Sequence, residues 1–451
     1  MRINKCLGRA IISLALLLPL GARAQESSVN TYSPYTLYGL GNMNYTGGTS
    51  FASMGGTSIA FRNGGFDHAG DLKLNTNNPA SLSGMVPKSF IFDVGLTGSN
   101  IYSRQNDPNP MIGRLKSSYN TFNVSNVTVG IPLARRLGFA LNIAPYSNVG
   151  YYIHTDDYGY LADLGVVRYY YIGEGDTTEA KASVGWEPFK GLSIGAELIY
   201  LWGNINRTYK AEIAPYTGTG SYNNGYNAMT AYTNEKVSRV YGGFGLQYTP
   251  LVKNKSRLTI GATYRLGGKL NAKETDYIPS GNVYGDTVRF DKKTMTTYIP
   301  QSIGVGVFFH RPKFNVGVDY IYQNWADKNP YDHVNNVGYT NTSTFRFGAQ
   351  LTPDRYNIRS FMKRVTYRVG FRYNDHYMQF QGHKINEKAV TFGFEIPFKM
   401  MTVSNVNVGF EFGERGTLKN NMIRERYFKI NLGVFLFGRD YDYWFEKYKY
   451  N

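Results

Sequence analysis

The sequence contains only one cysteine, Cys6, and it stands ahead of the apolar stretch 10–20. It is therefore not placed as a lipid-anchored cysteine would be. Basic residues before this stretch and a small-x-small site at 22–24 predict a secretory signal over residues 1–24, cleaved before Gln25. The mature chain then has no cysteine, which excludes disulfides and cysteine-ligated metals.

Long hydrophobic runs are also missing after the signal. No later segment offers about 20 consecutive apolar residues, so no helical membrane span is predicted. The mean hydropathy of −0.36 is that of many soluble proteins, but strands that alternate apolar and polar residues cancel in any such average. Acidic residues are outnumbered 32 to 49 by lysine and arginine, and no nucleic-acid motif accompanies this excess in a secreted chain.

Features of enzymes are scarce. Six histidines occur, and no nucleophile motif accompanies them. His68 lies near Asp67 and Asp71, and His154 near Asp156, but both groups lie in polar connecting segments without a second ligand cluster. We interpret them as solvated loop residues and expect no catalytic residue, no metal and no cofactor.

Glycine and tyrosine are abundant, with 50 and 39 copies, and both recur in segments of strict alternation. Period two is the signature of a strand with two different faces. Fourteen segments show it: 89–99, 121–131, 137–148, 177–187, 192–205, 236–248, 257–269, 297–309, 313–324, 342–351, 365–374, 387–396, 404–414 and 426–437. We expect the stretch 166–172 to lie within a loop.

The connections between these segments alternate in length. Short ones, such as 134–136 and 188–191, follow most even strands, and long ones, such as 206–235 and 271–296, follow most odd strands. This pattern is typical of an all-β, antiparallel transmembrane barrel with tight periplasmic turns and long external loops. It predicts a barrel of about fourteen strands over 88–438 in the outer membrane of a Gram-negative bacterium, with both termini periplasmic and a C-terminal tail over 439–451.

The two faces of the strands differ in character. Ile303, Val305, Val307 and Phe309 share one face, which we expect to contact lipid. The opposite face carries glycine in nearly every strand, with charges between. Small residues and mixed charges suit a crowded interior. The charges expected to line the lumen are Asp93, Lys181, Glu197, Arg265, Asp319, Arg346, Arg368, Arg372, Glu395, Glu411 and Lys429.

Residues 25–87 lack sustained alternation. They contain "SPYTLYGLG" (33–41), "ASMGGTSIAF" (52–61) with Gly55 and Gly56, and the run Asn78, Pro79, Ala80 just before the first strand. This order resembles the FadL family of outer-membrane transporters for hydrophobic compounds. The resemblance implies a fourteen-stranded barrel with an N-terminal hatch in its lumen, and makes these five residues candidates for a ligand or hatch site. "SPYTLYGLG" is similar to the start of an uncharacterised outer-membrane branch related to that family.

Pro145 interrupts the third strand. Leu137, Phe139, Leu141 and Ile143 alternate outward, and Pro145 continues that parity without an N–H to give to a neighbouring strand. The resemblance implies a lateral opening here, formed by Pro145, Tyr146 and Ser147, with the hatch around Asn78 facing it. The alternative is that Pro145 ends the strand at the head-group level, where water satisfies the backbone.

Three functions remain open. The first is passive uptake of a hydrophobic small molecule. The second is a partner-binding barrel in a secretion or surface-assembly complex, with long loops such as 215–235 as protein contacts. The third is a structural barrel without cargo. The expected surroundings are outer-membrane lipid and lipopolysaccharide, and the basic short turns either contact anionic head groups or are simply solvated.

Overall fold

The computed structural model describes residues 30–63, 72–106, 114–157, 166–214, 229–253, 256–279, 287–290, 298–326, 337–398 and 403–439. The predicted signal sequence, the site around His68 and all but the first residue of the predicted tail lie outside these ranges.

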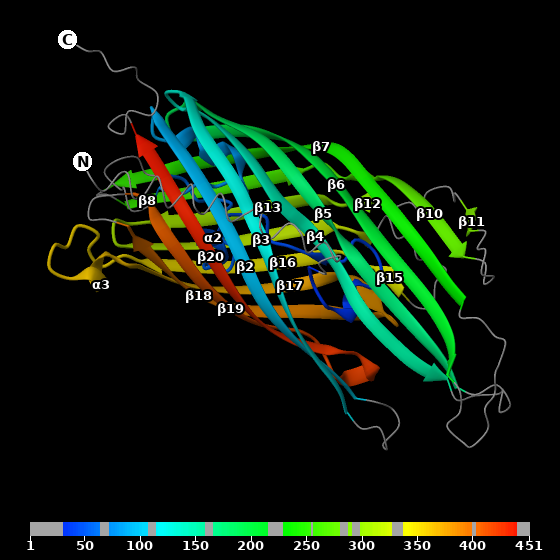
Figure 1. Ribbon diagram of the computed structural model, residues 1–451. Coiled ribbons are helices and arrows are strands. Elements are labelled where there is room, and N and C mark those ends of the chain that lie inside the picture. The colour runs from blue at the N-terminus through cyan, green and yellow to red at the C-terminus, as the bar shows by residue number, and fades with distance from the viewer. Residues whose placement is uncertain are drawn as a thin grey trace, which may run out of the picture.

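The strands form a closed antiparallel barrel of fourteen, as the alternation predicts (Figure 1). Each strand pairs with the next along the chain, and the first and last strands pair to close it. The strands are β2 (Ser89–Asn106), β3 (Arg114–Ala134), β4 (Leu137–Asp157), β5 (Val166–Phe189), β6 (Leu192–Ala214), β7 (Met229–Lys253), β8 (Ser256–Arg265), β13 (Gln301–His310), β14 (Phe314–Asn324), β16 (Thr342–Leu351), β17 (Thr366–Phe380), β18 (His383–Pro397), β19 (Asn405–Gly416) and β20 (Arg424–Arg439).

Short strands and helical turns complete the structure. β10 (Asn271–Pro279) pairs with β7 and with β11 (Thr287–Phe290). β15 (Val337–Tyr339) pairs with β17, and β9 (Gly268–Lys269) pairs with β12 (Tyr298–Ile299). The described residues contain no helix that is long and apolar enough to cross a membrane. The helical turns are η2 (Pro34–Thr36), α2 (Thr49–Ala52), η4 (Pro79–Gly84), α3 (Phe361–Arg364) and η6 (Lys419–Asn421).

The strands extend further at the long-loop end than the alternation indicates. The expected loop 166–172 is wrong, because these residues continue β5 and pair with Thr208 to Ala214 of β6. The stretch reads Val-Val-Arg-Tyr-Tyr-Tyr-Ile, so its two faces do not differ in polarity. A hydrogen-bonded ladder beyond the apolar band has no need of an apolar face, and period two therefore disappears while the strand persists.

The outward face carries the predicted apolar side chains. Ile303, Val305 and Val307 are 52%, 48% and 47% exposed, whereas the alternate residues of β13 are half-buried or buried. A band of exposed aliphatic and aromatic side chains continues around the other strands, for example Leu198 of β6 and Phe244 of β7. This band is what a lipid-facing barrel wall requires.

The N-terminal segment fills the lumen, where the blue ribbon of Figure 1 runs between the strands. Inward glycines allow this close packing. A Cβ on Gly138 would lie 2.2 Å from the carbonyl oxygen of Leu82, and one on Gly185 would lie 2.3 Å from that of Pro79. The backbone of the hatch therefore touches the backbone of the wall, which explains the glycine-rich inner face.

Candidate functional site

The seam between β3 and β4 is incomplete. Their ladder runs from Ala134–Leu137 only as far as Val127–Ile143. The outer sides of both strands remain paired much further, β2 with β3 to Asn106–Arg114 and β4 with β5 to Asp157–Val167. The outer halves of β3 and β4 thus part from each other, and we name the space between them the gap.

Pro145 lies where the two strands separate. It pairs with Thr178 of β5, the next pair is Ser147 with Thr177, and Tyr146 is the extra residue of a β-bulge. A bulge bends its strand and increases its twist. Beyond it the outward parity is lost, and Val149 is fully buried. The three residues singled out in the sequence therefore mark the point where β4 leaves β3.

The segment 33–44, which we name the strap, takes the place of β3 beside β4. Within it, β1 (Asn42–Met43) pairs with Asn148 and Ser147. The N–H of Asn44 donates to the Tyr146 carbonyl at 2.9 Å. Further out, the N–H of Ser33 donates to the carbonyl of Gly150 at 2.8 Å. The strap therefore satisfies backbone groups of β4 that lipid could not.

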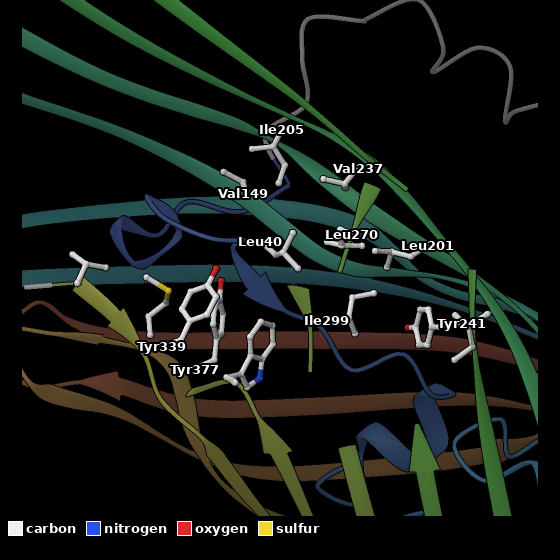
Figure 2. Packing of buried hydrophobic residues seen from close by; sticks show 14 of the residues in the cluster. Leu40, Val149, Leu201, Ile205, Val237, Tyr241, Leu270, Ile299, Tyr339 and Tyr377 are labelled. Atoms are coloured by element: carbon white, nitrogen blue, oxygen red, sulfur yellow. The ribbon is translucent and has the colours of Figure 1, made fainter. Parts of the chain in front are cut away.

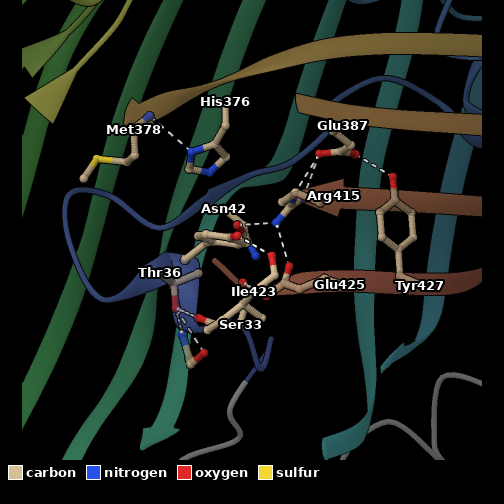
Figure 3. Close-up of polar contacts among 12 residues, drawn as sticks. Ser33, Thr36, Asn42, His376, Met378, Glu387, Arg415, Ile423, Glu425 and Tyr427 are labelled. Carbon is tan, nitrogen blue, oxygen red and sulfur yellow. Dashed lines mark hydrogen bonds and ion pairs between the residues drawn. The ribbon is translucent and has the colours of Figure 1, made fainter. Parts of the chain in front are cut away.

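The strap is also bonded to β20, on the β3 side of the gap, and to β17 further around the wall (Figure 3). The Ser33 hydroxyl donates to Glu425 of β20 at 2.5 Å, and the Tyr35 hydroxyl donates to the carbonyl of Ile423. Tyr377 of β17 donates to the carbonyl of Gly41 at 2.8 Å. The "SPYTLYGLG" motif thus links β4 to β17 and β20.

An apolar cluster packs around the strap inside the barrel (Figure 2). Leu40 of the strap is fully buried against side chains from several walls, among them Val149, Leu201 and Val237. Trp325 stacks on Tyr377 with ring centroids 4.4 Å apart and meets Tyr339 edge to face. These contacts fill the lumen around the strap with apolar side chains.

A cavity of about 240 Å³ lies between the hatch and the wall. It extends to Val124 of β3 and Pro145 of β4 at the gap, and Val124 is itself half exposed. Its deeper wall is an ion-pair network. Arg372 lies 2.6 Å from Glu411 and 3.1 Å from Glu387. A lumen cavity therefore borders on the lateral gap.

Several polar atoms of this cavity have no hydrogen-bond partner among the described residues: the Thr49 hydroxyl, Asn44 Nδ2, Asn148 Oδ1 and Arg346 Nε. Thr49 and Asn148 are 2% and 6% exposed. Arg346 donates to the Gly56 carbonyl and lies over the ring of Tyr45, but no described carboxylate lies within ion-pair distance of it. Buried groups of this kind normally have a partner, so the cavity offers a polar molecule both donors and acceptors.

The predicted lumen charges all point inward, but most of them are enclosed between the hatch and the wall. Lys181 pairs with Glu179 at 2.9 Å, and Arg265 with Glu197 at 2.7 Å. Arg368 pairs with Glu395. None of these residues lines the cavity.

Two predicted aspartates accept hydrogen bonds, one from the hatch and the other from a neighbouring strand of the wall. Asp319 accepts hydrogen bonds from the N–H groups of Ser58 and Ile59, at 2.6 and 2.9 Å. Asp93 accepts a longer one from Asn126. Of the predicted charges, only Arg346, Arg372, Glu411 and Lys429 reach the cavity.

Besides Asp375, three cavity charges were missed by the sequence analysis: Glu387, Arg415 and Glu425. Arg415 lies 2.8 Å from Glu387 and 3.6 Å from Glu425, which makes it the centre of the outer network (Figure 3). All three continue the inward parity of their strands. Glu387 is the first residue of the expected strand 387–396. Arg415 and Glu425 lie one residue outside the expected strands 404–414 and 426–437. Extending that parity by one or two residues would have found them.

The hatch motifs lie elsewhere than the gap. Gly55 and Gly56 have φ of +66° and +87°, and a Cβ on Gly55 would lie 2.7 Å from the carbonyl of Phe371. Pro79 and Ala80 pack on Gly185 and Gly195. This places the first pair against β16–β17 and the second against β5–β6.

The expectation that the hatch around Asn78 faces the opening is wrong. Asn78 caps η4 and donates to the carbonyls of Ile59, Leu246 and Ala262, which hold it against β7 and β8. The strap borders the gap instead. No group of three metal-ligating side chains occurs among the described residues.

A closed fourteen-stranded barrel with a luminal N-terminal hatch and a lateral gap defines the structural class. The BamG family model matches residues 6–451, and the protein belongs to this family. No curated protein sequence matches the chain.

Solved structures share the fold at low sequence identity. A Pseudomonas aeruginosa FadL homologue aligns with a TM-score of 0.55 and 12% identity over 88% of this chain and 99% of its own. The Pseudomonas putida toluene transporter TodX aligns at 0.52 and 18%, over 89% and 100%. The Ralstonia pickettii toluene transporter TbuX aligns at 0.51 and 16%, over 87% and 98%. The resemblance to FadL-type barrels is thereby confirmed for the fold, and none of the three is described as an enzyme.

Proposed function

We propose that this protein is an outer-membrane barrel that passes a small amphiphilic molecule between its lumen and the surrounding lipid through the gap between β3 and β4. The observation that carries the proposal is the end of the β3–β4 ladder at Val127–Ile143, beside a cavity that extends to Val124 and Pro145. The fold shared with toluene transporters supports the transport of molecules of low polarity.

The chemistry of the cavity supports a cargo that is not purely apolar. A hydrocarbon would leave the Thr49 hydroxyl and Asn148 Oδ1 unpaired, whereas a cargo with a hydroxyl or carbonyl group would bond to them. A buried site built for hydrogen bonds discriminates strongly against an analogue that lacks the bonding group. The apolar part of the cargo would lie toward Val124 and the lipid.

Uptake of 1-decanol and of decane by cells with equal barrel abundance tests both the lateral route and the preference for a cargo with a polar group. Pro145→Val removes the proline that starts the bulge, and uptake of both probes is expected to fall several-fold. Thr49→Val removes one unpaired hydroxyl at nearly constant shape, and only decanol uptake should fall. Pro397→Val, at the far end of β18, is the matched control. Wild-type uptake by Pro145→Val would exclude the lateral route.

A second candidate is a partner-binding barrel, which the tall wall β4–β7 favours. These strands have 21 to 25 residues, whereas crossing a bilayer takes about 9–11. Roughly half of this wall therefore extends beyond the lipid. A photo-crosslinker at exposed Tyr152 should capture a defined protein, and one at exposed Tyr356, in the connection between β16 and β17 at the opposite end, should not. Equal, heterogeneous adducts at both sites would exclude this function.

A further inference from the structure

Two lysines face each other on the outside of the tall wall. Lys236 of β7 and Lys273 of β10 are direct partners in the antiparallel ladder, and both are exposed. Like charges directly opposite each other in a sheet are destabilising. No carboxylate of the described residues lies within ion-pair distance of either. Among the residues that the structure describes, the positive charge of this pair therefore has no ion-pair partner.

The lysines belong to a groove of about 830 Å³. The strand register places Asp176, Asn204, Lys236 and Lys273 in one row across β5, β6, β7 and β10. Asp176, the one acidic side chain that lines the groove, already accepts a hydrogen bond from Asn30. The adjacent row contains Trp202, Ser238 and Asn271, and a third lysine, Lys269, also borders the groove.

The position of the groove relative to lipid follows from β6. Its outward residues run from Leu198, which is 60% exposed, through Tyr200 and Trp202 to Asn204. Tyr200 and Trp202 stack with ring centroids 5.2 Å apart. Exposed tyrosine and tryptophan mark the interface of a bilayer with water. The lysine row lies immediately beyond them, at the level of the outer-leaflet head groups.

We propose that this groove binds the phosphate-bearing head of an outer-leaflet glycolipid. A phosphate between the ammonium groups of Lys236 and Lys273 converts their repulsion into two charge-assisted contacts. A sugar ring lies on the indole of Trp202, and its hydroxyls meet Asn204, Ser238 and Asn271. The acyl chains follow the apolar band below Tyr200. This inference rests on the outer-membrane location proposed above and is independent of any cargo.

Native mass spectrometry of the full-length mature protein in a zwitterionic detergent tests the site. The probes are diphosphorylated lipid A, the same glycolipid without phosphates, and inorganic phosphate. Lipid A should bind at least tenfold more tightly than either of the others. The double variant K236Q/K273Q should lose at least tenfold of that affinity. K388Q is the matched control, because exposed Lys388 of β18 faces Glu414 in register.

Thermal unfolding supplies a second readout, because the substitution should raise Tm without lipid but lower the increase in Tm that lipid A produces. Without lipid, Lys273→Gln should raise Tm, because it removes the like-charge pair. With lipid A it should reduce the gain in Tm that wild type shows. Retained lipid A binding by K236Q/K273Q, or equal binding of the dephosphorylated glycolipid or of free phosphate, overturns the proposal. Decanol uptake by Thr49→Val and Pro145→Val reports the transport function separately, so failure of one does not imply failure of the other.

Discussion

Two seams of the barrel join long strands and yet differ in completeness. β2 and β20 pair without interruption from Ser89–Arg439 to Arg104–Arg424. β3 and β4 pair only over the part next to their short connection, and beyond Ile143 the strap replaces β3 as the partner of β4. Length does not cause the difference, since both β3 and β4 have 21 residues. A barrel in lipid opens where another part of the chain takes over the backbone hydrogen bonds, because the bilayer offers none.

Removal of the hatch should produce the largest effect on this comparison. Deletion of residues 44–77 takes out most of the luminal packing and joins the rest of the strap directly to Asn78. We expect a nearly silent protein to become a channel with steady conductance in planar bilayers. The undeleted protein, purified in parallel, is the control. Recordings of the deletion variant that stay closed would show that something other than the hatch blocks the lumen.

Glycine-to-alanine substitutions should have different effects at the two seams, because the packing around the two glycines differs. On β4, a Cβ at Gly138 would lie 2.2 Å from the carbonyl oxygen of Leu82, so Gly138→Ala must shift the hatch. We expect a loss of about 1–3 kcal/mol in the free energy of unfolding. On β2, the nearest atom to a Cβ at Gly98 is 3.6 Å away, so Gly98→Ala should change it by less than about 0.5 kcal/mol. Equal values from denaturant unfolding in micelles would contradict this account.

Engineered disulfides test the continuity of each seam directly. Val94 and Val434 are partners across β2 and β20, so a cysteine pair there should oxidise readily. Ser125 and Pro145 are the positions that a continued β3–β4 ladder would bring opposite each other. A cysteine pair at these two positions should stay reduced, because the strands have parted. Mobility on non-reducing gels distinguishes the outcomes, and efficient oxidation of the second pair would mean that the gap closes.

The smallest effect is expected at the exposed outer end of the β19–β20 pair. Arg426 and Glu414 lie 2.7 Å apart, but they are 59% and 45% exposed. Solvent screens such pairs strongly, so Arg426→Gln should change the free energy of unfolding by under about 0.5 kcal/mol. A larger loss in the same denaturant assay would show that this outer end is less hydrated than its exposure indicates.

Alternation predicted the strands wherever one face meets lipid and the other a packed lumen. It failed over residues 166–172, where both faces of β5 lie beyond the apolar band, and it ended β19 before Arg415. Pro145 marked the break in β4 because a missing N–H is visible in a sequence. The strap was not predictable in the same way. Its position depends on contacts such as Ser33 with Glu425, which no local pattern encodes.

The reach of those contacts has a consequence for the order of folding. Ser33 and Glu425 are 392 residues apart, and Gly55 and Thr391 are 336 apart. Contacts this distant in sequence form late, since a long loop must close before they contribute. The hatch precedes the barrel in the sequence and is synthesised before it, yet it finds its bonding partners only once the final hairpin exists. An ordered hatch therefore indicates that the last strand is in place. The time at which residues 30–63 become protected from protease then reports when the barrel closes.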